Sequence, residues 1–331
     1  MGGVFNYSVA IRTLGTSGEK YYKLIRSIMN QSVLPEKIIV MLPYGYDAPE
    51  KIAGIEEFKY CTKSMIVQRV EALKYIESEF VLFCDDDLEF ENDFVDKLSK
   101  PLISGLYGCS TGPLLDLFPK NSLKYKAISL LGGSCVMLRD KKRKYVRILK
   151  TGGWSYNRDI DTSHCKYYDT DSFAGAVFLL KTSDMKKICF TDEIWAESTG
   201  YAAFEDRILS YKLKINGINS CIVSNAKYIH NDGRTSTKNL KLEPIYAATY
   251  NHYVFWHRFI YNVQNNFLIK LWSKICINYY MLMNCLYYMG KAITNRDNKK
   301  ALKVFFAAIK DARKFTKSNE YYALNDVIVK N

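Results

Sequence analysis

The 331-residue chain lacks several patterns that would indicate common functions. Its nine cysteines include no C-x-x-C pair, and Cys84 and Cys221 lie within apolar runs. We therefore interpret them as reduced, partly buried thiols of a cytosolic protein. No G-x-x-x-x-G-K-[ST] loop occurs, which argues against a P-loop nucleoside triphosphatase. The first residues do not combine a basic region, an apolar core and a small-residue cleavage site, so we expect no signal peptide.

Acidic residues are scarce in one part of the chain. Between Pro244 and Arg296 there is no Asp or Glu, while aromatic residues are frequent. Residues 227–331 contain 17 Lys and Arg and 6 Asp and Glu, a net charge of +11 out of +13 for the chain. Such an excess suits a nucleic acid, an anionic membrane or a phosphorylated ligand. We predict a domain at 1–243 and a basic, aromatic-rich helical extension at 244–331.

The periodicity of the first 90 residues predicts alternating strands and helices. Apolar runs at 7–14, 36–42 and 80–84 predict buried strands, and helical spacing occurs at 19–32 and 64–79. Alternation of this kind is typical of a mostly parallel, Rossmann-like α/β sheet with flanking helices. Further strands are expected at 173–181 and 220–230, with a helix at 205–218 between them. The basic run 139–150 predicts a surface hairpin or helix, and 152–172 predicts loop.

Three consecutive aspartates, Asp85, Asp86 and Asp87, end the third predicted strand. Ligands of α/β sheets bind beyond the carboxyl ends of the strands, and clustered carboxylates are ligands for hard cations such as Mg²⁺ and Mn²⁺. A turn in which Asp side chains accept local backbone hydrogen bonds is the structural alternative. A phosphatase with an aspartyl nucleophile is another, because Asp85 and Asp87 have the required alternation.

The residues around the aspartates resemble the family 2 glycosyltransferases, which have the GT-A fold. In "QRVEALKYIESEFVLFCDDD", the residues Arg69, Leu73, Glu79, Phe80 and the aspartates match the family in type and spacing. Further similar segments are "SVAIRTL", "SIMNQSVLPEKIIV", "FAGAVFLLKTSDMKKICFTDEIW", "FEDRILSYKLKINGI" and "AKYIHNDGRTS". The resemblance covers about residues 5–240. Two features depart from the family: Arg12 stands where Pro is usual, and no acid follows the second strand until Asp47.

The resemblance implies a site and a reaction. A sugar would move from a nucleoside diphosphate to a hydroxyl of a glycan or lipid-linked acceptor, with inversion and with Mn²⁺ or Mg²⁺, in surface polysaccharide assembly. The candidate residues are as follows: Asp87 and His230 for the metal, Thr13, Arg69, Asp85 and Asp86 for the nucleotide sugar, Asp206 and Glu205 as general base, and Trp154 and Trp195, secondarily, for the acceptor. Carboxylates at a helix N-terminus are kept ionised by the helix dipole, which favours the base assignment.

Two other function classes stay open at this point. One is the metal-dependent phosphatase or phosphotransferase that uses the Asp85–Asp87 cluster. The other is a non-enzymatic nucleic-acid-binding protein, suggested by the net charge and 26 tyrosines; an acidic strand end would repel its phosphates, so we expect no nucleic-acid partner.

The extension also raises the question of a membrane. Its longest uncharged run, residues 275–290, is shorter than the ~20 apolar residues that a span needs. Residues 253–291 and 298–317 instead predict basic amphipathic helices, suited either to packing on the catalytic domain or to peripheral contact with the anionic inner face of a membrane.

Overall fold

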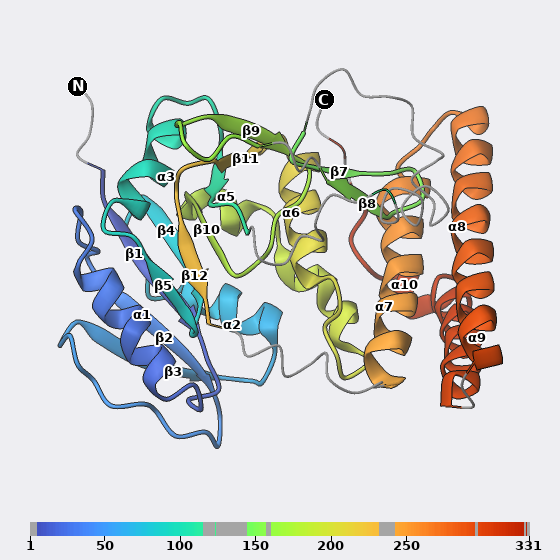
Figure 1. The fold of residues 1–331 in the computed structure, drawn as a ribbon, viewed down its shortest axis with the longest axis horizontal. Coiled ribbons are helices and arrows are strands. Elements are labelled where there is room, and N and C mark those ends of the chain that lie inside the picture. The colour runs from blue at the N-terminus through green and yellow to red at the C-terminus, as the bar shows by residue number, and fades with distance from the viewer. Residues whose placement is uncertain are drawn as a thin grey trace. The chain divides into compact units, whose positions relative to one another are not determined.

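The computed structural model describes residues 5–114, 123, 144–156, 160–231, 242–294, 297–327 and 329 (Figure 1). The chain divides into two compact units. The first, here called the sheet unit, comprises Met1–Leu117, Asp159–Ile194 and Glu205–Ser236. The second, here called the helical unit, comprises Phe118–Arg158, Trp195–Phe204 and Thr237–Asn331. Each unit is described separately below.

The elements of the sheet unit come mainly from the first half of the chain. In order they are β1 (Tyr7–Arg12), α1 (Glu19–Met29), β2 (Ile38–Pro43), β3 (Glu56–Cys61), α2 (Met65–Ala72), β4 (Phe80–Asp85), β5 (Leu88–Phe90), α3 (Phe94–Ile103), β6 (Cys109–Thr111), β9 (Tyr167–Thr170), β10 (Val177–Lys181), α5 (Thr182–Lys187), α6 (Glu205–Ile215), β11 (Ser220–Val223) and β12 (Tyr228–His230). A 3₁₀ segment, η2 (Phe190–Glu197), follows α5.

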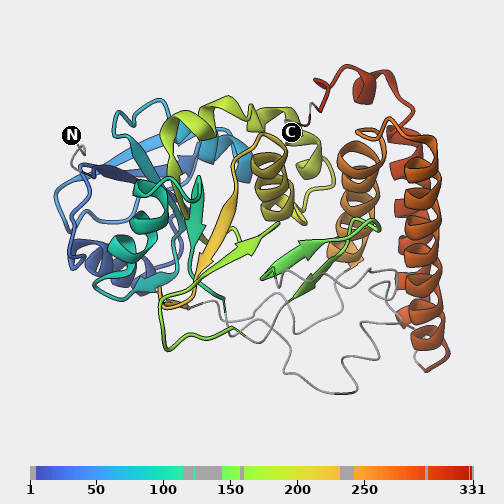
Figure 2. The same cartoon turned by 90° about the horizontal axis from the view of Figure 1, so that it is seen from above.

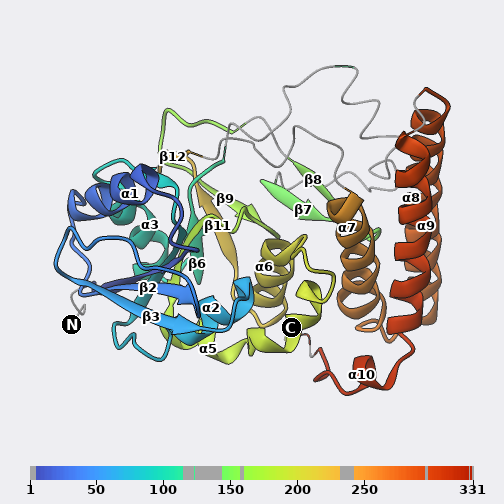
Figure 3. The same ribbon diagram turned by 90° about the horizontal axis from the view of Figure 1, so that it is seen from below.

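Eight strands form one mostly parallel sheet in the order β3-β2-β1-β4-β10-β6-β11-β9. Strands β3, β2, β1 and β4 run parallel, whereas β10 is antiparallel to both β4 and β6. Helices α1 and α3 cover one face and α2 and α5 the other (Figures 2 and 3). Because strand side chains alternate between faces, Tyr7, Val9 and Ile11 pack into the core cluster with α1 and α3.

This architecture confirms the predicted fold class, a mostly parallel α/β sheet with flanking helices. The strands expected at 7–14, 36–42, 80–84 and 173–181 are β1, β2, β4 and β10. Two expectations needed correction. The segment 220–230 forms two strands, β11 and β12, with a turn between them, and β12 leaves the main sheet to pair with β5. The expected loop 152–172 contains the strands β8 and β9.

The helical unit contains a small hairpin and a group of helices. Its elements are β7 (Val146–Ile148), β8 (Trp154–Tyr156), α7 (Leu242–Phe255), the π-helical turn η4 (Trp256–Tyr261), α8 (Phe267–Thr294), α9 (Asp297–Phe315) and α10 (Asn319–Tyr322). The end of the basic run 139–150 lies in the β7–β8 hairpin, whereas residues 139–143 lie outside the described residues. Helix α9 packs against both α7 and α8, and the helices expected in the extension are present.

Candidate functional site

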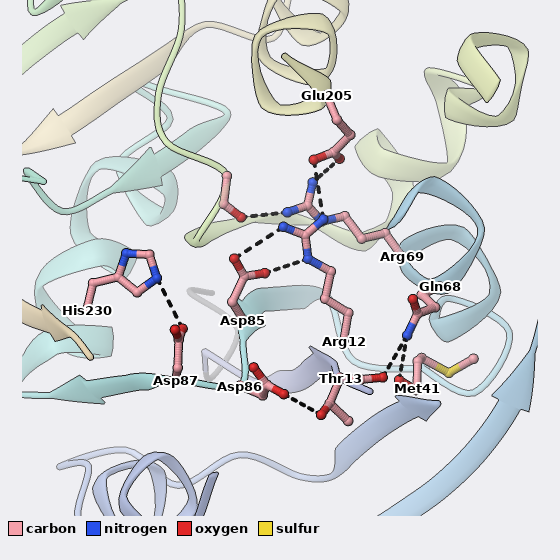
Figure 4. Close-up of polar contacts among 11 residues, drawn as sticks. Arg12, Thr13, Met41, Gln68, Arg69, Asp85, Asp86, Asp87, Glu205 and His230 are labelled. Atoms are coloured by element: carbon pink, nitrogen blue, oxygen red, sulfur yellow. Dashed lines mark hydrogen bonds and ion pairs between the residues drawn. The ribbon is translucent and has the colours of Figure 1, made fainter. Parts of the chain in front are cut away.

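Asp85 is held by an arginine from the neighbouring strand. Strands β1 and β4 are parallel and in register, so that Arg12 pairs with Asp85 where both strands end. The Arg12 Nε donates to Asp85 Oδ1 at 2.5 Å, and Nη2 donates to Oδ2 at 3.2 Å (Figure 4). The side chains keep 13% and 23% of their surface exposed. Burial acts to lower the pKa of Arg12, but the carboxylates of Asp85 and Glu205 outweigh it and raise that pKa.

Asp86 turns toward Thr13 on the loop after β1. The Thr13 hydroxyl donates to Asp86 Oδ2, and the backbone N–H of Gly15 donates to Thr13 Oγ1 at 2.8 Å. The buried amide of Gln68 donates to the carbonyl oxygens of Thr13, at 3.1 Å, and Met41, at 2.8 Å, and so fixes the ends of β1 and β2 together (Figure 4). Burial raises the pKa of Asp86, with the neighbouring aspartates acting in the same direction.

Asp87 meets His230 because β5 and β12 pair immediately beyond the aspartates. In that antiparallel pair His230 lies opposite Leu88, and the Asn231 N–H donates to the Asp87 carbonyl at 2.8 Å. His230 Nε2 lies 3.1 Å from Asp87 Oδ1 (Figure 4). Within the described part of the chain, that buried oxygen accepts no hydrogen bond. A carboxylate oxygen and an imidazole nitrogen therefore lie together, and both are atom types that bind divalent cations in proteins.

A buried charge cluster lies at the N-terminus of α6. Glu205, only 2% exposed, accepts a hydrogen bond from Arg69 Nη1 and another from Arg12 Nη1, the latter at 3.3 Å. Arg69 also donates through Nη2 to the Gly175 carbonyl at 2.6 Å. Burial and the nearby Arg12 charge lower the pKa of Arg69. The Glu205 carboxylate is thus shared by two guanidinium groups.

Asp206, the next residue, has a different environment. The Arg207 backbone N–H donates a hydrogen bond to Asp206 Oδ1 at 2.8 Å. Burial and the negative charge of Glu205 raise its pKa, against the opposing effects of that N–H and of nearby guanidiniums. The pKa of Asp206 is thus shifted in the direction opposite to the one that the helix dipole alone would produce. A Cβ at Gly175 would lie 2.9 Å from Asp206 Cβ, so only glycine allows this approach.

The two tryptophans belong to the helical unit. Trp154 packs edge-to-face on Phe204, with ring centroids 5.2 Å apart, and part of its ring is exposed. Trp195 is 3% exposed.

The sheet unit thus gathers eight of the ten residues predicted from the sequence into two neighbouring sets. The first set lies at or just beyond the ends of β1, β4 and β12, and comprises Thr13, Asp85, Asp86, Asp87 and His230. The second set adjoins it through Arg12, and comprises Arg69, Glu205 and Asp206. Among the described residues, no three His, Cys, Asp or Glu side chains are gathered to hold a metal ion unaided. Asp87 and His230 still fit a cation that takes its other ligands from substrate phosphates and water, as Mg²⁺ commonly does.

Three contributing residues were not predicted from the sequence. Arg12 was noticed only as a departure from the family pattern, and Gln68 and Gly175 gave no signal. The charge of Arg12 next to an acidic strand end, in a neighbouring parallel strand, is the one clue that could have predicted its pairing with Asp85.

Comparisons with known proteins identify the fold. No family model and no curated protein matches the sequence. Among solved structures, GalNAc-T7 with UDP, GalNAc and Mn²⁺ aligns with a TM-score of 0.52 at 11% identity, over 85% of this chain and 56% of that one. Residues 1–349 of S. aureus TarS align with a TM-score of 0.50 at 14% identity, over 92% of this chain and 81% of that one. The chain therefore spans little more than half of the GalNAc-T7 chain. At such identities the likeness shows the fold, which is of the GT-A type.

Proposed function

We propose that the protein is a glycosyltransferase, of family 2 by the sequence resemblance, that uses a nucleoside-diphosphate sugar. The observation that carries the proposal is the pair of Asp87 Oδ1 and His230 Nε2, 3.1 Å apart, next to the acidic end of β4. Ligands of α/β sheets bind beyond the carboxyl ends of the strands, and the aspartates stand at that end of β4. The structural neighbours are themselves glycosyltransferases, and one was crystallised with UDP, GalNAc and Mn²⁺.

Asp87 and His230 would hold a divalent cation, Mn²⁺ or Mg²⁺, which supplies positive charge to the diphosphate as it leaves with the bonding electrons. Thr13 and Asp86 would orient the nucleotide together. Asp86 is only partly buried, and Thr13, 5% exposed, donates to Asp86 Oδ2 and so fixes the orientation of that carboxylate. Asp85 is held by Arg12, so any contact with the ribose or base would be made through a carboxylate whose orientation is already fixed.

Asp206 is our general base and Glu205 its positioning neighbour. The acceptor hydroxyl transfers its proton to the carboxylate, its oxygen forms a bond with the anomeric carbon, and the bond from that carbon to the diphosphate oxygen breaks. A base must be free to accept a proton. Glu205 is engaged by two guanidiniums, whereas Asp206 makes no ion pair with any described residue. Its raised pKa moves the carboxylate toward the neutral range in which a base works best.

The acceptor is a hydroxyl of a glycan or lipid-linked glycan, in keeping with surface polysaccharide assembly at the cytoplasmic side. The division into a catalytic domain, 1–243, and a basic, aromatic-rich extension, 244–331, stays a prediction, and the helical unit also includes residues 118–158 and 195–204. Of the two tryptophans, Trp154 is the better candidate for stacking on the acceptor because it is only partly buried, whereas Trp195 is 3% exposed.

The phosphatase alternative is disfavoured by one contact. An aspartyl nucleophile needs a free oxygen, and both oxygens of Asp85 accept hydrogen bonds from Arg12.

A ligand screen tests the proposal. UDP-, GDP- and dTDP-sugars are added with and without Mn²⁺, and the unfolding temperature is measured. A ligand at 100 times its dissociation constant stabilises the folded state by about 2.7 kcal/mol, so a true donor should raise the unfolding temperature, and more so with Mn²⁺. If no sugar nucleotide stabilises the protein with or without Mn²⁺ while a phosphomonoester does, the assignment is wrong.

A further inference from the structure

Helix α8 has an apolar face that no other described part of the chain covers. Six of its large apolar side chains, 47% to 86% exposed, are Trp272, Ile275, Leu282, Leu286, Met289 and Ile293. Their positions are three, four or seven residues apart, the spacing that places side chains on one side of a helix. The stripe extends along most of a helix of 28 residues, which is roughly 42 Å long.

The other side of α8 is already occupied. Ser273, Cys276, Ile277 and Met281 are buried, and the rings of Tyr288 and Phe305 on α9 lie 5.3 Å apart. Within the helical unit, α9 packs against both α7 and α8. The exposed stripe is therefore not the packing face of the helix, and an exposed apolar patch of this length marks a docking surface.

The charge of the region indicates what docks there. Helix α8 carries Lys270, Lys274 and Lys291 and contains no Asp or Glu. Residues 244–331 hold 13 Lys and Arg against 4 Asp and Glu, a net charge of +9. A second copy of α8 would bring only like charges to the contact. An anionic lipid surface supplies both the apolar interior for the stripe and the opposite charge for the lysines.

We propose that α8 lies along an anionic membrane surface, with the stripe inserted below the headgroups and the net positive charge of residues 244–331 attracting the helix to that surface. The exposed Trp272 and Tyr287 have the amphipathic rings that collect at this depth. No helix among the described residues is long and apolar enough to cross a membrane, and the proposal requires none. The contact would hold the enzyme in the plane in which a lipid-linked acceptor is found.

The test uses the full chain and flotation with liposomes of phosphatidylcholine containing roughly one third phosphatidylserine. The double variant Leu282→Gln with Leu286→Gln removes two apolar side chains of the stripe, which are 56% and 49% exposed. Its matched control, Ile103→Gln with Leu106→Gln, removes two side chains of similar exposure, 59% and 62%, from the sheet unit. We expect the wild type and the control to float at low salt, where screening is weakest. The stripe variant should partition at least about tenfold less, which corresponds to about 1.4 kcal/mol.

Three results would overturn the proposal: a wild type that ignores anionic vesicles, a stripe variant that floats as well as the control, or equal binding to pure phosphatidylcholine at any salt concentration. Sedimentation without vesicles tests for the other occupant, a second copy of the chain. If the wild type is a dimer, the stripe variant a monomer and neither floats, a second copy covers α8. The readout is binding, so a failure here leaves the proposed transfer reaction untouched, and a failed donor screen leaves this proposal untouched.

Discussion

Glu205 and Asp206 are adjacent carboxylates, and we predict that neutralising each one changes the free energy of unfolding and the transfer rate differently. Glu205 is buried and bridges two guanidiniums, of which Arg69 is 3% exposed. Removing one partner of a buried ion pair costs about 3–5 kcal/mol, because the remaining charge is left uncompensated. Here Arg69 keeps the Gly175 carbonyl and Arg12 keeps Asp85. We therefore expect Glu205→Gln to lower the free energy of unfolding by about 3 kcal/mol, the lower end of that range.

Asp206→Asn should behave differently. The folded protein raises the pKa of Asp206, which means that folding disfavours its charged form. Above the pKa of the unfolded chain, about 3.9, that charge therefore destabilises the folded state, increasingly so as the pH rises through the folded value. Asparagine removes this penalty and keeps an oxygen for the Arg207 N–H. The unfolding free energy at neutral pH should fall by no more than about 0.5 kcal/mol or should increase, while transfer slows by at least the ~10²-fold expected for a lost base.

Urea unfolding at neutral pH, monitored by circular dichroism, measures the free energy of unfolding of both variants. The control is Glu19→Gln, which breaks an exposed ion pair with Arg26, 62% exposed, and should change stability by less than about 1 kcal/mol. If Glu205→Gln is no more destabilising than this control, or if Asp206→Asn is the less stable of the pair, the division of roles is wrong.

Four other perturbations follow from the site. Asp87→Asn should abolish transfer in limiting Mn²⁺ without unfolding the protein, and full activity under those conditions would remove Asp87 from the metal site. Arg12→Gln frees Asp85 and one oxygen of Glu205, so the stability to urea should fall and the Michaelis constant for the donor should rise. A variant with wild-type values would show that the ion pair contributes to neither. Gly175→Ala introduces a Cβ 2.9 Å from Asp206 Cβ. It should reduce the turnover number, measured by kinetics, more than the donor affinity, measured by titration calorimetry. Because the pKa of Asp206 is raised, the turnover number should fall on the acidic side of its pH profile with an apparent pKa above the ordinary aspartate value of about 3.9. An apparent pKa at or below that value would identify another base.

Much of the fold was predictable because its central strands are encoded locally. β1, β2 and β4 are mostly apolar and almost wholly buried, since both faces of this part of the sheet are covered. Helices α1 and α2 have apolar residues at helical spacing. Strand β3 was missed because it lies at the sheet edge and reads "EEFKYC", with only its first and last residues buried. β12 was merged with β11 because the turn between them, residues 224–227, has no Gly or Pro.

The site was predictable in membership and less so in arrangement. The acidic strand end and the His at 230 are visible in the sequence, but their meeting depends on the pairing of β5 with β12, two three-residue strands without a local signal. The bridge from Arg12 through Glu205 to Arg69 joins residues separated by 193 and 136 positions. Contacts at such separations follow from sheet order, which single-sequence periodicity does not contain.

The central claim is that a sugar leaves a nucleoside diphosphate at the acidic end of β4. The most direct measurement is product analysis after incubating the protein with Mn²⁺ and the sugar nucleotide that stabilises it, comparing the wild type with Asp87→Asn. The account predicts that the wild type releases the intact nucleoside diphosphate, by transfer or by slow hydrolysis, and that the variant releases none. Release of inorganic phosphate from phosphomonoesters, with the sugar nucleotide left whole, would contradict it.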